Sequence, residues 1–139
     1  MSATQDLLTA IVSACNSHAV FVSAGLSITL TQAPETATLP WMLFAILPGT
    51  RIERAFDKSS TQSYMIQFTV VSGSALQAVQ LADELLTLFD CQTFTTGGPE
   101  TVVQAYLSRP PTCRQVQRSS AGQPVFTAMA IYRFDLFVP

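Results

Sequence analysis

The residue types that carry chemistry in proteins are sparse in this chain, and one pair of them has a spacing that a reaction could use. Cys15 lies three residues before His18, the single histidine. A nucleophilic thiol needs a base within hydrogen-bond reach, so a thiolate–imidazole pair is the first possibility. Cys15 falls on the apolar stripe of a predicted helix, however, which favours an inert buried thiol. We therefore expect His18 to be a helix-end or packing residue.

Two other patterns resemble parts of known sites but lack the rest of them. Asp83 and Glu84 are adjacent on the outer arc of a second predicted helix, where carboxylates are solvated or interfacial rather than an acid–base pair. Gly97-Gly98 has neither the lysine nor the following helix of a phosphate-binding loop. Potential metal ligands do not cluster along the chain. The sequence therefore predicts no enzyme, no cofactor and no metal site.

The cysteines and the N-terminal residues indicate the cellular compartment in which the protein is made. The chain has three cysteines, an odd number without a CxxC pattern, so we expect reduced thiols rather than a disulfide framework. Met1–Asp6 lacks the basic start of a signal peptide. The longest apolar run, Leu39–Pro48, is interrupted by proline and falls short of the roughly 20 residues that span a bilayer. We expect a soluble protein, made in the cytoplasm, with no membrane partner.

The scarcity of charge is the most informative feature of the composition. Charged residues make up 12% of the chain, against about 25% in an average soluble protein. Ser, Thr and Gln take their place, and such a surface suits later coverage by other protein. The alternative is a chain that uses neutral polar residues on a surface that stays exposed. We favour the first interpretation, an assembling protein.

The basic residues are concentrated in two stretches. A net charge of −2 argues against a general nucleic-acid binder, which would carry a basic face. Of the seven basic residues, only Arg133 stands apart from the two stretches. The first stretch contains Arg51, Arg54 and Lys58, and the second contains Arg109, Arg114 and Arg118.

Periodicity predicts two helices and up to five strands. Apolar residues recur at helical spacing over Thr4–Asn16 and over Ser74–Asp90, and Ser74 and Gln77 have the spacing of a capping box. Trp41–Leu47 is short and almost wholly apolar, so we expect a central strand buried on both faces. Three further predicted strands alternate in polarity: Leu26–Thr31, Tyr64–Val71 and Val125–Val138. Thr101–Leu107, which ends before Arg109-Pro110-Pro111, is the fifth predicted strand.

Two long connections separate these strands. Arg51–Ser63 is polar and longer than a hairpin requires, which predicts a projecting, functional loop. Arg109-Pro110-Pro111 predicts the end of a strand and the start of a polar loop that runs to Gln123. Together the elements predict one α+β domain over residues 1–139. It has a mainly antiparallel sheet of four to five strands, with two helices packed on one face.

At this level of detail the chain resembles the tail terminator, or tail completion, proteins of long-tailed bacteriophages. The resemblance lies in the order of elements over nearly the whole chain, and no invariant motif carries it. Its segments are the opening helix, the strand start at Leu39-Pro40-Trp41, the strand and helix of Tyr64–Ser72 and Ser74–Leu86, and the Arg109 loop followed by Gly122 and Phe126–Phe137.

The resemblance implies a virion structural subunit without catalytic residues. Family members close into a ring, commonly a homohexamer, which caps the tail tube at the head–tail junction. The implied partners are other copies of the chain, the tail tube protein and a neck or head-completion protein, and DNA passes through the lumen without sequence-specific binding. Assembly would take place in the host cytoplasm. The closure of such a ring is a heterologous contact, so its two patches differ.

We assign the contacts of this ring to the two basic stretches. The Arg51–Ser63 loop is the first candidate for contact with the tube or an adjacent subunit, and the Arg109–Gln123 loop is the second. Three alternatives remain: another head–tail joining or neck protein, a small ligand-binding regulatory domain, and an enzyme that uses Cys15 and His18. The candidate interface residues are Arg51, Arg54, Phe56, Lys58, Arg109, Arg114 and Arg118.

Overall fold

The fold is taken from a computed structural model, which describes residues 3–30, 39–48, 51–54, 60–96, 101–118 and 124–138. Within these ranges the chain forms three helices and seven strands. The helices are α1 (Ala3–Ser17), α2 (Ala19–Ala24) and α3 (Ala75–Phe89). The strands are β1 (Ser27–Leu30), β2 (Trp41–Ile46), β3 (Arg51–Arg54), β4 (Ser60–Ser72), β5 (Gln92–Thr95), β6 (Thr101–Arg118) and β7 (Pro124–Val138).

The strands form one sheet in the order β1-β2-β4-β7-β6-β5, with β3 paired to β4 outside this path. The β1–β2 pair is parallel and the other pairs are antiparallel. The α+β class is therefore as predicted, whereas the sheet is mixed and has more strands than the four to five expected. The short strands β3 and β5 and the helix α2 span four to six residues each, too few to show a period in the sequence.

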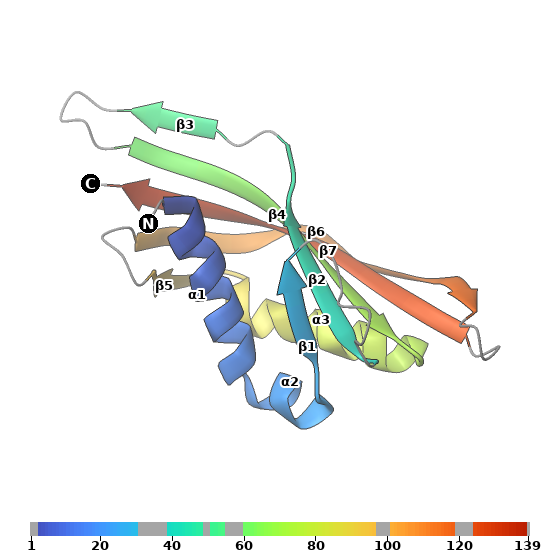
Figure 1. Cartoon of the computed structure of the whole chain (residues 1–139). Helices are drawn as coiled ribbons and strands as arrows, with labels where there is room; N and C mark the ends of the chain where they lie inside the picture. The colour runs from blue at the N-terminus through green and yellow to red at the C-terminus, as the bar shows by residue number, and fades with distance from the viewer. Residues whose placement is uncertain are drawn as a thin grey trace.

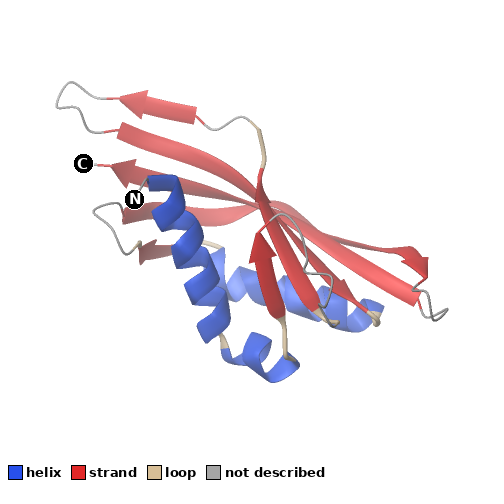
Figure 2. Cartoon of the chain, in the orientation of Figure 1, coloured by secondary structure: helices blue, strands red, loops and turns tan. Residues whose placement is uncertain are grey.

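The helices lie together on one side of the sheet (Figure 2). Strand β4 turns alternate residues toward them, because successive side chains of a strand point to opposite faces. Phe68 is the centre of the core between the layers. Its ring lies 5.5 Å from Phe89 of α3 and 5.6 Å from Tyr132 of β7, between ring centroids. Buried residues of β2, β7 and α1 complete this core, including Met42, Phe44, Ala130, Phe134, Leu7 and Ile11.

Helix α3 begins and ends close to the predicted residues. Ser74 is its N-cap, and its hydroxyl accepts a hydrogen bond from the Gln77 backbone N–H at 3.4 Å. The Gln77 side chain accepts a hydrogen bond from the Ser72 hydroxyl. The predicted capping-box spacing therefore corresponds to a cap in the structure, although the reciprocal partner is Ser72.

The prediction that Trp41–Leu47 is buried on both faces was wrong. Met42 and Phe44 are buried against the helices, whereas Trp41, Leu43 and Ala45 are only half-buried on the opposite face. An apolar run does not reveal whether a second layer covers its outer face. No described element packs there.

The predicted strand end at Arg109-Pro110-Pro111 was also wrong. Strand β6 continues through these residues to Arg118, paired with β7. Register shifts in the β6–β7 ladder flank the prolines, between Leu107 and Arg109 and between Arg109 and Thr112. Within the described residues β5 pairs only with the first part of β6, so the prolines lie on a free edge, where a missing N–H costs no ladder bond.

The predicted Arg51–Ser63 loop is largely a pair of strands. Residues Arg51–Arg54 of β3 pair with Ser60–Ser63 at the start of β4. Strand β4 is therefore longer than the predicted Tyr64–Val71. Phe56 and Lys58 lie outside the described residues, as do positions 119–123 of the predicted second loop.

Candidate assembly surfaces

The structure places Arg51 and Arg54 of the first predicted basic stretch at one end of the sheet and Arg114 and Arg118 of the second at the other. The β3 segment with Arg51 and Arg54 lies beside β4 residues that pair with the end of β7, at Asp135–Val138. Arg114 and Arg118 pair with the start of β7, at Thr127 and Pro124. From Thr127 to Asp135 is about 27 Å along an extended strand. Figure 1 shows this separation between β3 and the far end of the β6–β7 hairpin.

Among the described residues, the sheet face opposite the helices is open and has a regular arrangement of side chains. Ala45 of β2, Gln67 of β4, Ile131 of β7 and Arg109 of β6 are partners in register and form one row across four strands. A second row next to it contains Leu43, Thr69, Met129 and Thr112. None of these eight side chains is buried, and no described helix covers them.

The two rows form a shallow trough. Gln67, Arg109, Pro110, Thr112, Met129 and Ile131 line a hollow of about 270 Å³. Leu43, Phe44, Ala45, Gln67 and Thr69 line a neighbouring hollow of about 200 Å³. The two hollows share Gln67, whose amide NH₂ donates to Thr69 Oγ1 at 3.4 Å and contacts Met129 Sδ at 3.5 Å. The trough therefore has an apolar floor, a central amide and a guanidinium at its β6 end.

A polar network borders the trough on the next rows of the sheet. Arg133 Nε donates to Asp135 Oδ1 at 2.9 Å, and the Ser63 hydroxyl donates to the same oxygen at 2.6 Å. The Arg133 guanidinium also lies 5.7 Å from the centre of the Tyr106 ring, a cation–π distance. The charge of Arg133 is thus compensated within the chain. Arg109, by contrast, is exposed and forms no ion pair with any residue that the structure describes.

Charge is segregated between the layers. No Lys or Arg occurs in residues 1–50 or 59–108, which include all three helices, and no Asp or Glu occurs in residues 101–134, which include most of the β6–β7 hairpin. The helical side therefore carries only acidic groups and the hairpin only basic ones through Phe134. Two surfaces of opposite sign on one subunit are suited to contact between copies.

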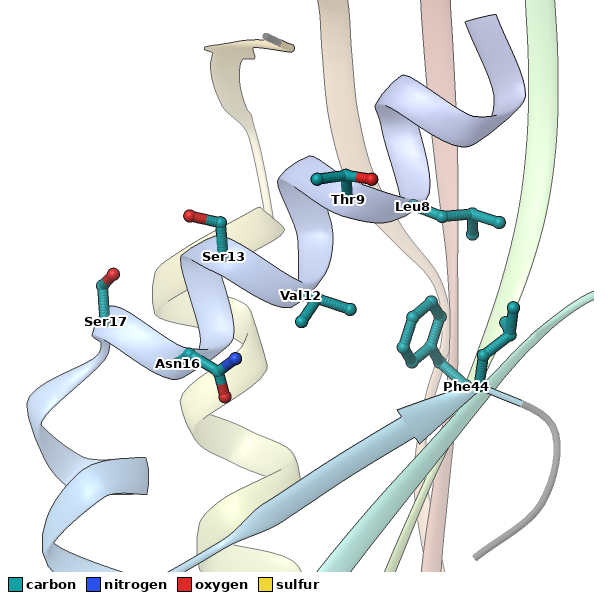
Figure 3. Close-up of a pocket in the computed structure, with 8 residues that line it drawn as sticks. Leu8, Thr9, Val12, Ser13, Asn16, Ser17 and Phe44 are labelled. Carbon is teal, nitrogen blue, oxygen red and sulfur yellow. The ribbon is translucent and has the colours of Figure 1, made fainter. Parts of the chain in front are cut away.

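A third hollow, on the helical side, lies between α1 and the edge strand β1 and measures about 500 Å³. Leu8, Val12 and Asn16 point from α1 toward Phe44, and Thr9, Ser13 and Ser17 lie along the outer side of the helix (Figure 3). Leu30 of β1 also lines it. No titratable side chain is among these residues, so the hollow provides no group for acid–base chemistry.

The residues considered for catalysis lie in separate environments. Cys15 is buried, and burial raises the pKa of its thiol from 9.0 to about 12. Its contact with His18 is a backbone hydrogen bond, from the His18 N–H to the Cys15 carbonyl at 3.2 Å. The His18 ring instead contacts Glu84 and lies edge-on to Phe21, 4.9 Å between ring centres. His18 is therefore a helix-end packing residue, as expected, and the thiol–imidazole pair does not form.

The adjacent residues Asp83 and Glu84 also lie in different environments. Asp83 is exposed on α3 without an ion-pair partner in the described part of the chain, whereas Glu84 contacts His18. The described residues hold no group of three His, Cys, Asp or Glu side chains that could bind a metal. None of the described helices is long and apolar enough to cross a bilayer.

Comparison with known proteins gives no match in sequence, either to a family model or to a curated protein. The fold does match solved structures. A chain in the virion of a native gene transfer agent particle superposes with a TM-score of 0.66 over 91% of both chains, at 14% identity. A second structure, of a protein without a descriptive name, matches with a TM-score of 0.57 over 96% of both chains, at 19% identity.

What the chain shares with these two structures is the fold. The match covers most of each chain, so it includes the long strands and not only a common helix–strand core. At this identity it establishes the architecture and transfers no residue roles.

Sequence reasoning missed the trough and one residue of the helical surface. Leu76 of α3 is 68% exposed, an unusual position for a leucine on a helix that buries a broad apolar face. The sequence does contain a signal for it, because Leu76 is one turn before the polar residue Gln80 and therefore lies on the same side of the helix. The cross-strand rows could not be found, since register depends on pairing between distant segments.

Proposed function

We propose that this chain is a non-enzymatic virion subunit that forms a ring, caps the tail tube and connects it to the head or neck. The observation that carries the proposal is the fold shared with a chain of a gene transfer agent virion over 91% of both chains. The subunit would reside at the head–tail junction, after assembly in the host cytoplasm. Its ring would contain six copies and enclose a lumen through which DNA passes.

The shape and charge of the subunit support a ring. A closed ring of identical subunits needs two different patches on each copy, because its contacts are heterologous. The sheet offers such a pair, with an open face on one side and an acidic helical layer on the other. The ends of the sheet provide further surfaces, which we assign to the tail tube and the neck protein. The scarcity of charge favours burial in these contacts, since desolvating charge is costly.

Electron microscopy of particles assembled without this protein tests the proposal. We expect tail tubes that are overlong or uncapped, because the terminator that would end them is missing. Tails of normal length that fail to join heads would instead assign the chain to the neck, the second candidate. Complete particles with tails of normal length would refute both roles.

A ligand-binding domain is the candidate from another class, and the hollow between α1 and β1 favours it. At about 500 Å³ it is large enough for a small molecule. Such a domain would bind a metabolite as a monomer or dimer and would ignore tail tubes. Retention of the chain on purified tubes, with no bound small molecule in native mass spectra, separates the two candidates.

A further inference from the structure

We propose that the trough on the open sheet face receives helix α3 of a second copy, with Asp83 of that copy beside Arg109. This inference rests on the proposed ring and specifies the contact between its subunits. The trough comprises the two rows Ala45–Gln67–Ile131–Arg109 and Leu43–Thr69–Met129–Thr112. The inserted surface is the exposed stripe of α3.

The exposed residues of α3 lie on a single stripe. Leu76, Gln80, Asp83 and Thr87 are exposed, and the residues between them are buried or half-buried. Their spacing of four, three and four residues places them on one side of a helix. This stripe points away from the core of its own copy. An amphipathic stripe with an apolar anchor at one end is the kind of surface that docks into a groove.

Charge complementarity identifies the occupant as another copy. Arg109 and Asp83 are both exposed, and neither has an ion-pair partner among the described residues. The two residues lie on opposite faces of the subunit, because Arg109 pairs in register with Ile131 on the open face and α3 covers the other. They cannot meet within one copy. Within its own copy α3 runs along β6, since Ala75 lies beside Cys113 and Asp90 beside Leu107. A second copy turned so that its α3 crosses the strands of the first brings its Asp83 to the free guanidinium.

The chemistry of the trough matches the stripe at three points. Across the sheet, β2 and β6 are three strand spacings apart, about 14 Å. Along α3, Leu76 and Asp83 are seven residues apart, about 10.5 Å. With Leu76 over Leu43 and Ala45, Gln80 lies over β4 near Gln67, and Asp83 lies toward β6. The arginine side chain spans the remaining distance, so an apolar contact, an amide pair and an ion pair form together.

The contact uses different surfaces of the two copies and therefore repeats. Each subunit keeps a free trough on one side and a free α3 stripe on the other, so addition continues until the ring closes. A symmetric dimer cannot form through the trough and the α3 stripe alone, because the two surfaces lie on opposite faces of the subunit. The contact also covers the half-exposed residues of β2 and β7 and the leucine that is 68% exposed in the single chain.

Charge reversal tests the ion pair in the full-length chain. Arg109→Asp and Asp83→Arg should each weaken association between copies by at least about tenfold, as for a central interface residue. The double variant, which restores opposite charges, should recover association to near the starting value. Val22→Asp provides the control for Leu76→Asp: both residues are more than 60% exposed, and only the Leu76 change should disrupt association. Circular dichroism confirms that each variant is folded.

A disulfide tests the geometry. In a chain with Cys91 and Cys113 replaced by serine, Gln67→Cys and Gln80→Cys together should form covalent multimers under mild oxidation. Gln67→Cys with Thr9→Cys, an exposed position on α1, should remain single chains. The buried Cys15 serves as an internal thiol that does not react.

The outcomes separate this contact from the ring itself. If Arg109→Asp forms rings of normal mass, the contact is wrong and the ring stands. If rings form but the variant loses only tube binding, the trough receives a different protein, and the second-copy assignment is refuted. If the unaltered chain never associates, alone or on tail tubes, the proposed function fails as well. Rescue by the double charge reversal supports the contact.

Discussion

His18 Nε2 lies 2.9 Å from Glu84 Oε2, although the two residues are 66 positions apart in the chain. The contact joins the N-cap of α2 to the middle of α3, so it links the N-terminal helical segment to the helix that covers the sheet. Both side chains are partly exposed, at 17% and 33%. This position explains why the single histidine serves packing rather than catalysis.

A double-mutant cycle of His18→Ala and Glu84→Gln tests this contact. We expect a coupling free energy of about 0.2–1 kcal/mol, because the pair is partly exposed and screened by solvent. Urea unfolding of the four proteins provides the measurement. Strictly additive effects would show that the pair contributes nothing.

Removing the Tyr132 hydroxyl should not destabilise the protein. This oxygen is buried and has no hydrogen-bond partner among the described residues. Burial, with smaller effects from Asp90 and Asp83, also raises the pKa of the Tyr132 phenol. Tyr132→Phe keeps the ring and removes the unsatisfied group, so stability should stay equal or rise by up to about 1 kcal/mol.

Phe68→Ala is the comparison for Tyr132→Phe, since both residues belong to the same aromatic core. It should cost about 3–5 kcal/mol, because it leaves a cavity. A clear loss of stability in Tyr132→Phe would mean that the hydroxyl has a partner in solution.

The Cys15 thiol should make stability depend on pH in the alkaline range. The thiol has a pKa near 9.0 in the unfolded chain and about 12 in the fold. The unfolded state therefore releases its proton first. The stability present below pH 9 is lost as the pH rises toward 12, by up to about 1.4 kcal/mol per pH unit.

Comparing the unaltered chain with Cys15→Ala isolates this effect, since other ionisable groups are common to both. Urea unfolding at pH 8 and pH 10 should show a smaller loss for the variant. Equal losses would contradict a buried neutral thiol. Thiol reagents near pH 8 should label the exposed Cys91 and Cys113 and leave Cys15 unmodified until the chain unfolds.

Arg51→Glu with Arg54→Glu should impair assembly without unfolding the chain. Surface substitutions away from packed or hydrogen-bonded groups usually cost less than about 0.5 kcal/mol each, and we expect these two to be of that kind. Glu53→Gln in the same strand is the control and should assemble normally. The same reversal at Arg114 and Arg118 tests the opposite end of the sheet. Particle yield is the measurement, and normal yield from the reversed variants would show that the basic stretches are not contacts.

Local signals predicted the two long helices well, and they missed α2 and much of the sheet. Helix α3 begins where the Ser74 cap predicts, because capping and helical periodicity depend on neighbouring residues. Strand β6 passes through Pro110 and Pro111 because β7 offers a long partner, a fact that no local pattern contains. The trough has the same origin: Ala45 and Arg109 are 64 positions apart and share a row only through two intervening strands.

The basic residues show that their grouping along the chain does not determine where they lie in space. The sequence separates them into two stretches, but the distance in space from Arg51 and Arg54 to Arg114 and Arg118 follows from the length of β7, which no local pattern gives. Within the second stretch, Arg109 lies in the middle of β7's ladder with β6 and lines the trough. Leu76 is a candidate contact residue that the sequence did not predict. Its exposure points to a contact only when the α3 stripe and the open face are considered together.

Native mass spectrometry of the purified chain, at high concentration and after mixing with purified tail tubes, tests the central claim most directly. We predict a closed assembly of the 15.0 kDa chain, with six copies giving about 90 kDa, alone or on the end of the tube. A single 15.0 kDa species under both conditions, with none bound to tubes, would contradict the assignment to a tail ring.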